Sequence, residues 1–145
     1  PVGLEAAVYA KALGLAVAVY EQGQLAAHVE KWGFVRMFTP FGQSASPLGR
    51  ATLLREAPMR DLPADADVLT GRAFKAAYLT PLAESHHLKG CVRTESRVIA
   101  VGRGGWRKTD PPDPKKPLPP FRLLVRDPKG HEAFEAADAV LDCTG

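Results

Sequence analysis

The chain has 145 residues, of which 46% are hydrophobic and 24% charged, and its formal net charge is +3. This length and composition are typical of one globular domain, and the small, dispersed positive charge does not favour a nucleic-acid partner. No apolar run approaches the roughly 18 residues that a membrane-spanning helix needs, so no membrane partner is expected. The two cysteines form no CxxC pair, which argues against a disulfide framework or zinc site and favours a cytoplasmic location.

The first half of the chain predicts a helix and a buried strand before a less regular region. Residues 3–13 are rich in alanine and leucine, and Gly14 follows as a helix C-terminal residue. The nearly continuous apolar run at 15–20 predicts a strand covered on both faces, as in a parallel sheet flanked by helices. Residues 24–68 are interrupted by Gly, Pro and Ser, which indicates mostly loop with short helical pieces.

The second half predicts one more helix and then an antiparallel meander. Thr70 is an N-cap candidate for a helix from Gly71 to Leu88, which Pro81 should bend or break. Three antiparallel strands are predicted, at 97–103, 121–127 and 131–136. Seven of the 13 prolines fall between Pro111 and Pro128, so residues 108–120 should form a proline-rich loop. A last apolar strand is predicted at 139–142.

The opening residues, PVGLEAAVYAKALGLAVAVYEQG, carry a nucleotide-binding pattern. Gly3 stands at the start of the helix, where unpaired N–H groups and the positive end of the dipole attract a phosphate. Glu21 ends the following strand, 18 residues later. A carboxylate there accepts hydrogen bonds from both ribose hydroxyls and repels a 2′-phosphate. This spacing therefore predicts a dinucleotide site.

The pattern resembles the dinucleotide fingerprint of FAD-dependent oxidoreductases of the glutathione-reductase type, from its third glycine onward: Gly3-x₃-Ala7-x₆-Gly14-x₂-Val17-x-Val19-x-Glu21. The closing Cys143-Thr144-Gly145 is similar to their second FAD motif, Ala-Thr-Gly, with cysteine in place of alanine as in some flavin-containing monooxygenases. The resemblance covers the whole chain and implies a Rossmann-like α/β fold, with a parallel sheet plus a β-meander at about 97–136. Because the first strand and two glycines of the fingerprint are absent, we expect residues 1–145 to be a partial FAD-binding domain, with its N-terminal strand missing, cut from a longer flavoprotein.

The resemblance also implies which residues contact the cofactor. Three groups follow from it: Pro1, Val2 and Gly3 against the pyrophosphate; Glu21 at the adenosine ribose, with Gln22 beside it; and Cys143, Thr144 and Gly145 closing over the cofactor from the last strand. The backbone of Val98 would bracket the adenine. No residue is predicted as a general acid, base or nucleophile, so the catalytic residues stay unknown, and none is predicted as a metal ligand.

The implied function is the FAD-binding part of a flavin-dependent, NAD(P)H-using oxidoreductase that acts on a small-molecule substrate. The most similar branch is the flavin monooxygenases, in which NADPH reduces the flavin and a soft N or S nucleophile is oxygenated by O₂. Three alternatives stay open: a thioredoxin-reductase-like enzyme, because Gly23-Gln24-Leu25 is similar to part of its flavin-contacting segment, a nonenzymatic remnant of a flavoprotein, and a nicotinamide-binding domain. No oligomeric state is predicted.

Several further residues allow both a functional and a structural interpretation. The aromatic run that contains Trp32, Arg36, Phe38 and Phe41 either shields a flavin ring or packs a loop onto the domain. His86 and His87 are adjacent on the predicted helix, which favours a solvated helix end over a metal site. Cys91 and Cys143 are expected to be buried thiols rather than a redox pair.

Overall fold

The computed structural model describes residues 1–107, 109–111 and 117–144. Its elements are, in order, α1 (Val2–Ala12), β1 (Val19–Tyr20), α2 (Ala27–Lys31), α3 (Phe41–Ser44), α4 (Pro47–Glu56), α5 (Gly71–Phe74), the π-helical turn η1 (Lys75–Leu79), α6 (Thr80–Glu84), β2 (Val92–Arg93), β3 (Arg97–Arg103), β4 (Phe121–Arg126) and β5 (Glu132–Ala137). β1 pairs in parallel with β2, and β3, β4 and β5 form an antiparallel sheet.

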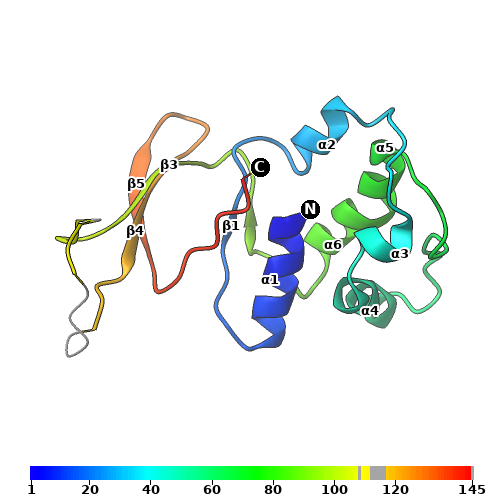
Figure 1. The fold of residues 1–145 in the computed structure, drawn as a ribbon, viewed down its shortest axis with the longest axis horizontal. Helices are drawn as coiled ribbons and strands as arrows, with labels where there is room; N and C mark the ends of the chain where they lie inside the picture. The colour runs from blue at the N-terminus through cyan, green and yellow to red at the C-terminus, as the bar shows by residue number, and fades with distance from the viewer. Residues whose placement is uncertain (108, 112–116, 145) are drawn as a thin grey trace.

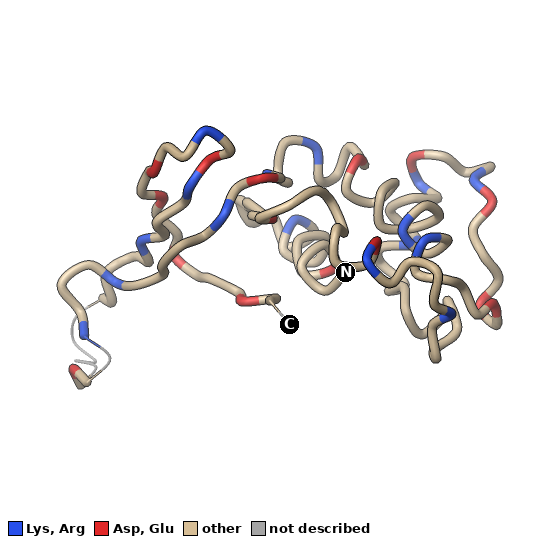
Figure 2. Tube along the Cα trace, turned by 90° about the horizontal axis from the view of Figure 1, so that it is seen from above, with Lys and Arg blue, Asp and Glu red and all other residues tan. Residues whose placement is uncertain are grey.

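The fold is therefore mixed α/β, with the helices at one end, the meander extending at the other, and β1 and β2 between them (Figure 1). Figure 2 shows basic and acidic residues interspersed over both the helical part and the meander. None of the helices in the described residues has the length and hydropathy to span a membrane. Of the predicted proline-rich loop, Lys108 and residues 112–116 lie outside the described residues.

Helix α1 ends where the sequence predicts. The amide of Leu15 donates to the carbonyl of Ala10 at 3.1 Å and that of Gly14 to the carbonyl of Lys11 at 2.9 Å. This pair of bonds is a Schellman motif, which needs a left-handed residue after the helix. Gly14 supplies it with φ of +77°. The turn reverses the chain, so that β1 runs back along α1.

The predicted helix at 71–88 is present but shorter and locally widened. Thr70 Oγ1 accepts a hydrogen bond from the amide of Ala73 at 3.2 Å, which confirms the predicted cap. The helix continues through α5, η1 and α6 to Glu84. Pro81 has no N–H to donate to the carbonyl one turn earlier. The π-helical turn at 75–79 lies directly before α6, where the α-helical hydrogen-bond pattern is interrupted. The proline therefore distorts the helix without breaking it.

The hydrophobic core lies among the helices. Its buried members are Leu4, Ala7, Val8, Val29, Phe41, Ala45, Leu53, Phe74, Tyr78, Leu79, Leu82 and Leu88. Three of the rings form one cluster: Phe74 stacks on Tyr78 with centroids 5.5 Å apart, and Phe41 meets Tyr78 edge-on at 5.7 Å. The meander adds only a small separate buried pair, Leu123 and Val125 on β4.

A buried polar contact joins three helices around Tyr78. The fully buried Tyr78 donates its hydroxyl hydrogen to Glu5 Oε1, and the amide of Ser46 donates to the same oxygen at 3.1 Å. Gly49 lies directly over this hydroxyl, since a Cβ atom built on it would be 1.9 Å from Tyr78 Oη. Only glycine fits at this position. The contact therefore ties α1 to α4 and η1.

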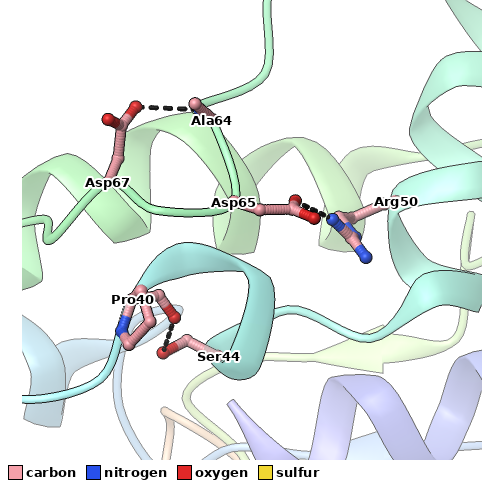
Figure 3. Close-up of polar contacts among 6 residues, drawn as sticks. All are labelled: Pro40, Ser44, Arg50, Ala64, Asp65 and Asp67. Carbon is pink, nitrogen blue, oxygen red and sulfur yellow. Dashed lines mark hydrogen bonds and ion pairs between the residues drawn. The ribbon is translucent and has the colours of Figure 1, made fainter.

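Residues 57–69 have little regular structure, yet polar contacts hold them against α3 and α4 (Figure 3). The carboxylate of Asp65 pairs with the guanidinium of Arg50 on α4. The carbonyls of Asp67 and Asp65 accept from the first amides of α3, at 2.8 and 3.0 Å. Asp67 Oδ2 also accepts from the amide of Ala64 at 2.8 Å. The loop thus satisfies amides at the start of α3 that the helix itself cannot.

Two predicted strands are wrong in extent. Of residues 15–20, only Val19 and Tyr20 pair with another strand, and Leu15 is 55% exposed, so the run is not covered on both faces. Residues 139–142 belong to no strand, and Leu141 is 71% exposed. An apolar run becomes a buried strand only if a neighbour accepts its backbone hydrogen bonds, and among the described residues β1 has such a neighbour on one edge alone.

The meander is predicted correctly. β3, β4 and β5 match the three expected strands to within one or two residues. Asp127 Oδ1 accepts from the amides of Lys129 and His131, and Gly130 adopts φ of +87° in the turn between β4 and β5. A β-bulge between Val98 and Ala100 leaves Ile99 without a cross-strand partner.

We predict that Gly49→Ala destabilises the protein by roughly 2–3 kcal/mol, because the new methyl group displaces the Tyr78 hydroxyl from Glu5. The melting temperature, followed by circular dichroism, should fall by about 6–12 °C. Gly102→Ala is the matched control, since nothing lies within 4 Å of a Cβ atom at that position. Equal melting temperatures for the two variants would contradict the packing described here.

Candidate functional site

The N-terminus of α1 is the first part of the predicted cofactor site. Pro1 is its N-cap, and its carbonyl accepts from the amides of Leu4 and Glu5 at 3.1 and 3.2 Å. The amides of Val2 and Gly3 precede these bonds and lie outside the helical hydrogen-bond pattern. Pro1 and Val2 are exposed, and Gly3 is half-buried. The helix thus presents two backbone donors at its positive end.

The structure brings Gly3 next to Cys143, from the opposite end of the sequence. A Cβ atom built on Gly3 would lie 3.6 Å from Cys143 Cβ, which is an ordinary van der Waals separation. The two predicted FAD motifs are therefore neighbours at this point of the structure, and the segment at 139–144 approaches α1 in Figure 1. Alanine would also fit at position 3 as far as this contact is concerned, so the packing does not by itself require glycine.

The C-terminal segment, which forms no strand at 139–142, also differs from its prediction in the exposure of its cysteine. Cys91 is buried as expected, but Cys143 is exposed, because residues 139–144 are not covered by a sheet. Thr144 donates its amide and hydroxyl hydrogens to Asp142 Oδ1, at 2.9 and 2.6 Å, and these bonds lower the pKa of Asp142. Gly145 lies outside the described residues.

Glu21 follows β1 directly, at its carboxyl end. Its Oε1 accepts from the amide of Gly23 at 2.8 Å, which orders the turn, and its side chain is half-buried. Gln22 beside it is exposed. The other carboxylate oxygen of Glu21 forms no hydrogen bond within the described residues. One oxygen is thus used to shape the turn.

Backbone bonds place Glu21 beside the start of β3. Ser96 donates its amide to the carbonyl of Glu21, and Glu95 donates to that of Gly23, both at 2.9 Å. Val98, the residue predicted to bracket an adenine, lies two residues after Ser96, is half-buried and pairs with Val125. The structure therefore brings together the predicted ribose and adenine residues.

The N-terminus of α1 and the carboxyl end of β1 lie at the same end of the α1–β1 unit (Figure 1). This follows from the tight turn at Gly14, which makes helix and strand antiparallel, and from the contact between them. Ligands in open α/β sheets bind outside the carboxyl ends of the strands. Three separate parts of the chain thus lie at the end of the α1–β1 unit where α1 begins and β1 finishes: Gly3, Glu21 and the segment around Cys143.

Sequence reasoning missed Arg93, which joins the parallel pair to the meander. Its Nη1 lies 2.8 Å from Tyr20 Oη and 2.9 Å from Glu135 Oε1, and its guanidinium lies 5.2 Å from the centre of the Tyr20 ring. Burial raises the pKa of Tyr20, and Arg93 partly offsets this. β2 is only two residues long, so no period-2 pattern marks it in the sequence.

The aromatic run divides into packing residues and one free side chain. Phe41 is 1% exposed within the core, and Trp32 packs closely against Gly71, so the structural interpretation holds for both. Arg36 bonds to the carbonyl of Val68 at 3.2 Å. Phe38 is 100% exposed and packs nothing. Of this run, Phe38 is the aromatic side chain that is fully open to solvent among the described residues.

A shallow groove lies elsewhere, between α4 and residues 62–63. It has a volume of about 350 Å³ and is lined by Phe41, Pro47, Arg50, Ala51, Leu54, Leu62 and Pro63. Its charged member, Arg50, is paired with Asp65 (Figure 3). The groove shares no residue with the predicted cofactor contacts.

Of the two adjacent histidines, His87 makes a structural contact. Its Nε2 lies 3.2 Å from the carbonyl oxygen of Val8, so the side chain joins the end of the 71–88 region to α1.

We predict that Phe41→Ala costs roughly 3–5 kcal/mol of folding free energy, because it leaves a cavity in the ring cluster. Phe38→Ala should change it by no more than about 0.5 kcal/mol, since that ring makes no packing contribution. Urea unfolding of both variants measures the difference. A large loss for Phe38→Ala would show that its ring is buried in solution.

Comparison with known proteins finds no relative. No protein-family model matches the chain, and no curated protein or solved structure is significantly similar to it.

Proposed function

We propose that this chain is the FAD-binding part of a flavin-dependent, NAD(P)H-using oxidoreductase, most similar to the flavin monooxygenases. The observation that supports the proposal best is the proximity of the two fingerprint segments, in which Gly3 at the start of α1 lies beside Cys143, so that a Cβ atom on Gly3 would be in van der Waals contact with it. FAD, when bound, would supply the redox chemistry, while the protein binds and orients it.

Each part of an adenine dinucleotide has a suitable group at this end of the molecule. The amides of Val2 and Gly3, with the positive end of the α1 dipole, suit a pyrophosphate. The carboxylate of Glu21 suits the ribose hydroxyls as an acceptor of charge-assisted hydrogen bonds. The neighbouring backbone at Val98 suits the adenine. The assignment of FAD rather than another dinucleotide rests on the resemblance and on the meander.

We also propose that a strand from outside residues 1–145 completes the parallel sheet, between β1 and the segment 139–142. Three observations among the described residues support it: β1 pairs with β2 alone, the apolar residues 15–18 belong to no strand, and residues 139–142 belong to no strand. Such a strand would pair the backbone of both segments and remove the open edge of the sheet.

The first test of this function is Glu21→Arg, assayed by titration of the 145-residue chain with ADP. We expect ADP binding to weaken by about 2 kcal/mol or more, because the change removes charge-assisted hydrogen bonds and adds a bulky cation at the ribose. Binding is followed by the shifts of backbone amide signals in NMR spectra, which detect weak ligands. Glu84→Arg, an exposed change of the same charge on α6, is the control. Equal affinities of both variants would remove Glu21 from the site.

The second test concerns the affinity of the chain as it stands. We expect residues 1–145 to bind FAD more weakly than about 10 µM, because the phosphate site lacks two of the three fingerprint glycines and the sheet has open edges. The amides of Val2, Gly3 and Gly23 should nevertheless shift on FAD addition, and riboflavin, which has no pyrophosphate or adenosine, should not shift them. Micromolar or tighter binding would show that no further strand is needed. No amide shift at millimolar FAD would contradict the proposed function.

A further inference from the structure

Glu5 raises a difficulty for the proposed phosphate site. It lies in the first turn of α1, the helix whose first amides would receive the pyrophosphate. A carboxylate in a first turn interacts favourably with the unpaired amides and the positive dipole end of its own helix. A free Glu5 side chain would therefore compete with a phosphate for the same donors and repel it.

The structure holds this carboxylate on the other side of the helix. Residues 3 and 5 are about 200° apart on a helix of 3.6 residues per turn, so Gly3 faces Cys143 while Glu5 faces α4 and η1. There, Glu5 Oε1 accepts from the hydroxyl of Tyr78 and from the amide of Ser46. Both donors come from the helical part of the protein, far away in the sequence.

The Tyr78 hydroxyl is an enclosed donor that stays protonated at neutral pH. Its ring is fully buried and stacked on Phe74. The hydroxyl occupies the space that a side chain at Gly49 would otherwise fill. Burial raises the pKa of Tyr78 and the Glu5 carboxylate raises it further, so the hydroxyl keeps its proton at neutral pH. Glu5 Oε2 is also enclosed, and among the described residues it has no hydrogen-bond partner. The carboxylate is thus retained through one oxygen alone.

We propose that Tyr78 is a positioning residue for the phosphate site, which, with the amide of Ser46, retains the Glu5 carboxylate and so leaves the amides of Val2 and Gly3 available to a phosphate. This inference rests on the proposed function. A purely structural role for Tyr78 differs from it in one measurable way, because the positioning role depends on the negative charge of Glu5, whereas a structural role depends on the hydrogen bond itself.

The test compares Tyr78→Phe, Glu5→Gln and the double variant by ADP titration, followed at the amides of Val2 and Gly3. Tyr78→Phe releases a charged carboxylate and should raise the ADP dissociation constant about 2- to 5-fold, the size expected of one charge at a helix terminus. Glu5→Gln should not raise it. The double variant should return to within about 2-fold of Glu5→Gln, although it also lacks the tyrosine hydroxyl. Adenosine, which has no phosphate, should show no such pattern.

The possible outcomes separate the two proposals. A double variant that binds ADP as weakly as Tyr78→Phe, or a Tyr78→Phe variant that binds like the parent chain, overturns the positioning role and leaves the proposed function standing. If Tyr78→Phe does not fold, Glu5→Gln decides alone, since a higher dissociation constant for this nearly isosteric change overturns the inference. If ADP shifts no amide of α1 in the parent chain, the proposed function fails and the inference with it.

Discussion

The helical part of this protein depends on the hydrogen bond between the buried hydroxyl of Tyr78 and the carboxylate of Glu5. A buried hydroxyl must find a partner, because leaving it unpaired costs about 1–3 kcal/mol. The partner lies 73 residues earlier, on α1, and the amide of Ser46 completes the contact. Gly49 is required for the same reason, since any side chain there would occupy the position of the hydroxyl. One contact thus sets the place of α1 against α4 and the helix from Gly71 to Glu84, and α1 in turn leads through Gly14 into β1.

The parallel sheet of β1 and β2 has only two residues paired in each strand within the described residues, and this small size explains where the core lies. Two paired residues on each of β1 and β2 cannot bury a face, so most of the buried residues that share a core with α1 lie in other helices, and Val19 and Val92 are only partly buried against that core. The meander is held to this short pair by polar contacts of Arg93 with Tyr20 and Glu135. Partly exposed ion pairs of this kind contribute little to stability.

The proposed function draws on groups that are individually common. A helix N-terminus, a glutamate after a strand and a half-buried valine occur in most α/β proteins, and each has an ordinary structural role here as well. Their arrangement is less common, because Gly3 lies beside Cys143 and the Glu21 turn is hydrogen-bonded to the residues that lead into Val98. The two contacts join four segments of the chain at the end where α1 begins and β1 finishes.

The sequence by itself determined the features that depend on a few neighbouring residues. The end of α1 at Gly14, the Thr70 cap and the meander with its Asp127–Gly130 turn all follow from local hydrogen bonds and backbone angles, so the pattern at each position was sufficient. The tertiary structure alone decided which apolar runs became strands, because residues 15–18 and 139–142 needed hydrogen-bond partners that the described residues do not supply. It also decided the pairing of Glu5 with Tyr78. From the sequence alone, the expected partners of a carboxylate in a first turn are the unpaired amides of its own helix, and only the folded chain brings Tyr78 and Ser46 to it.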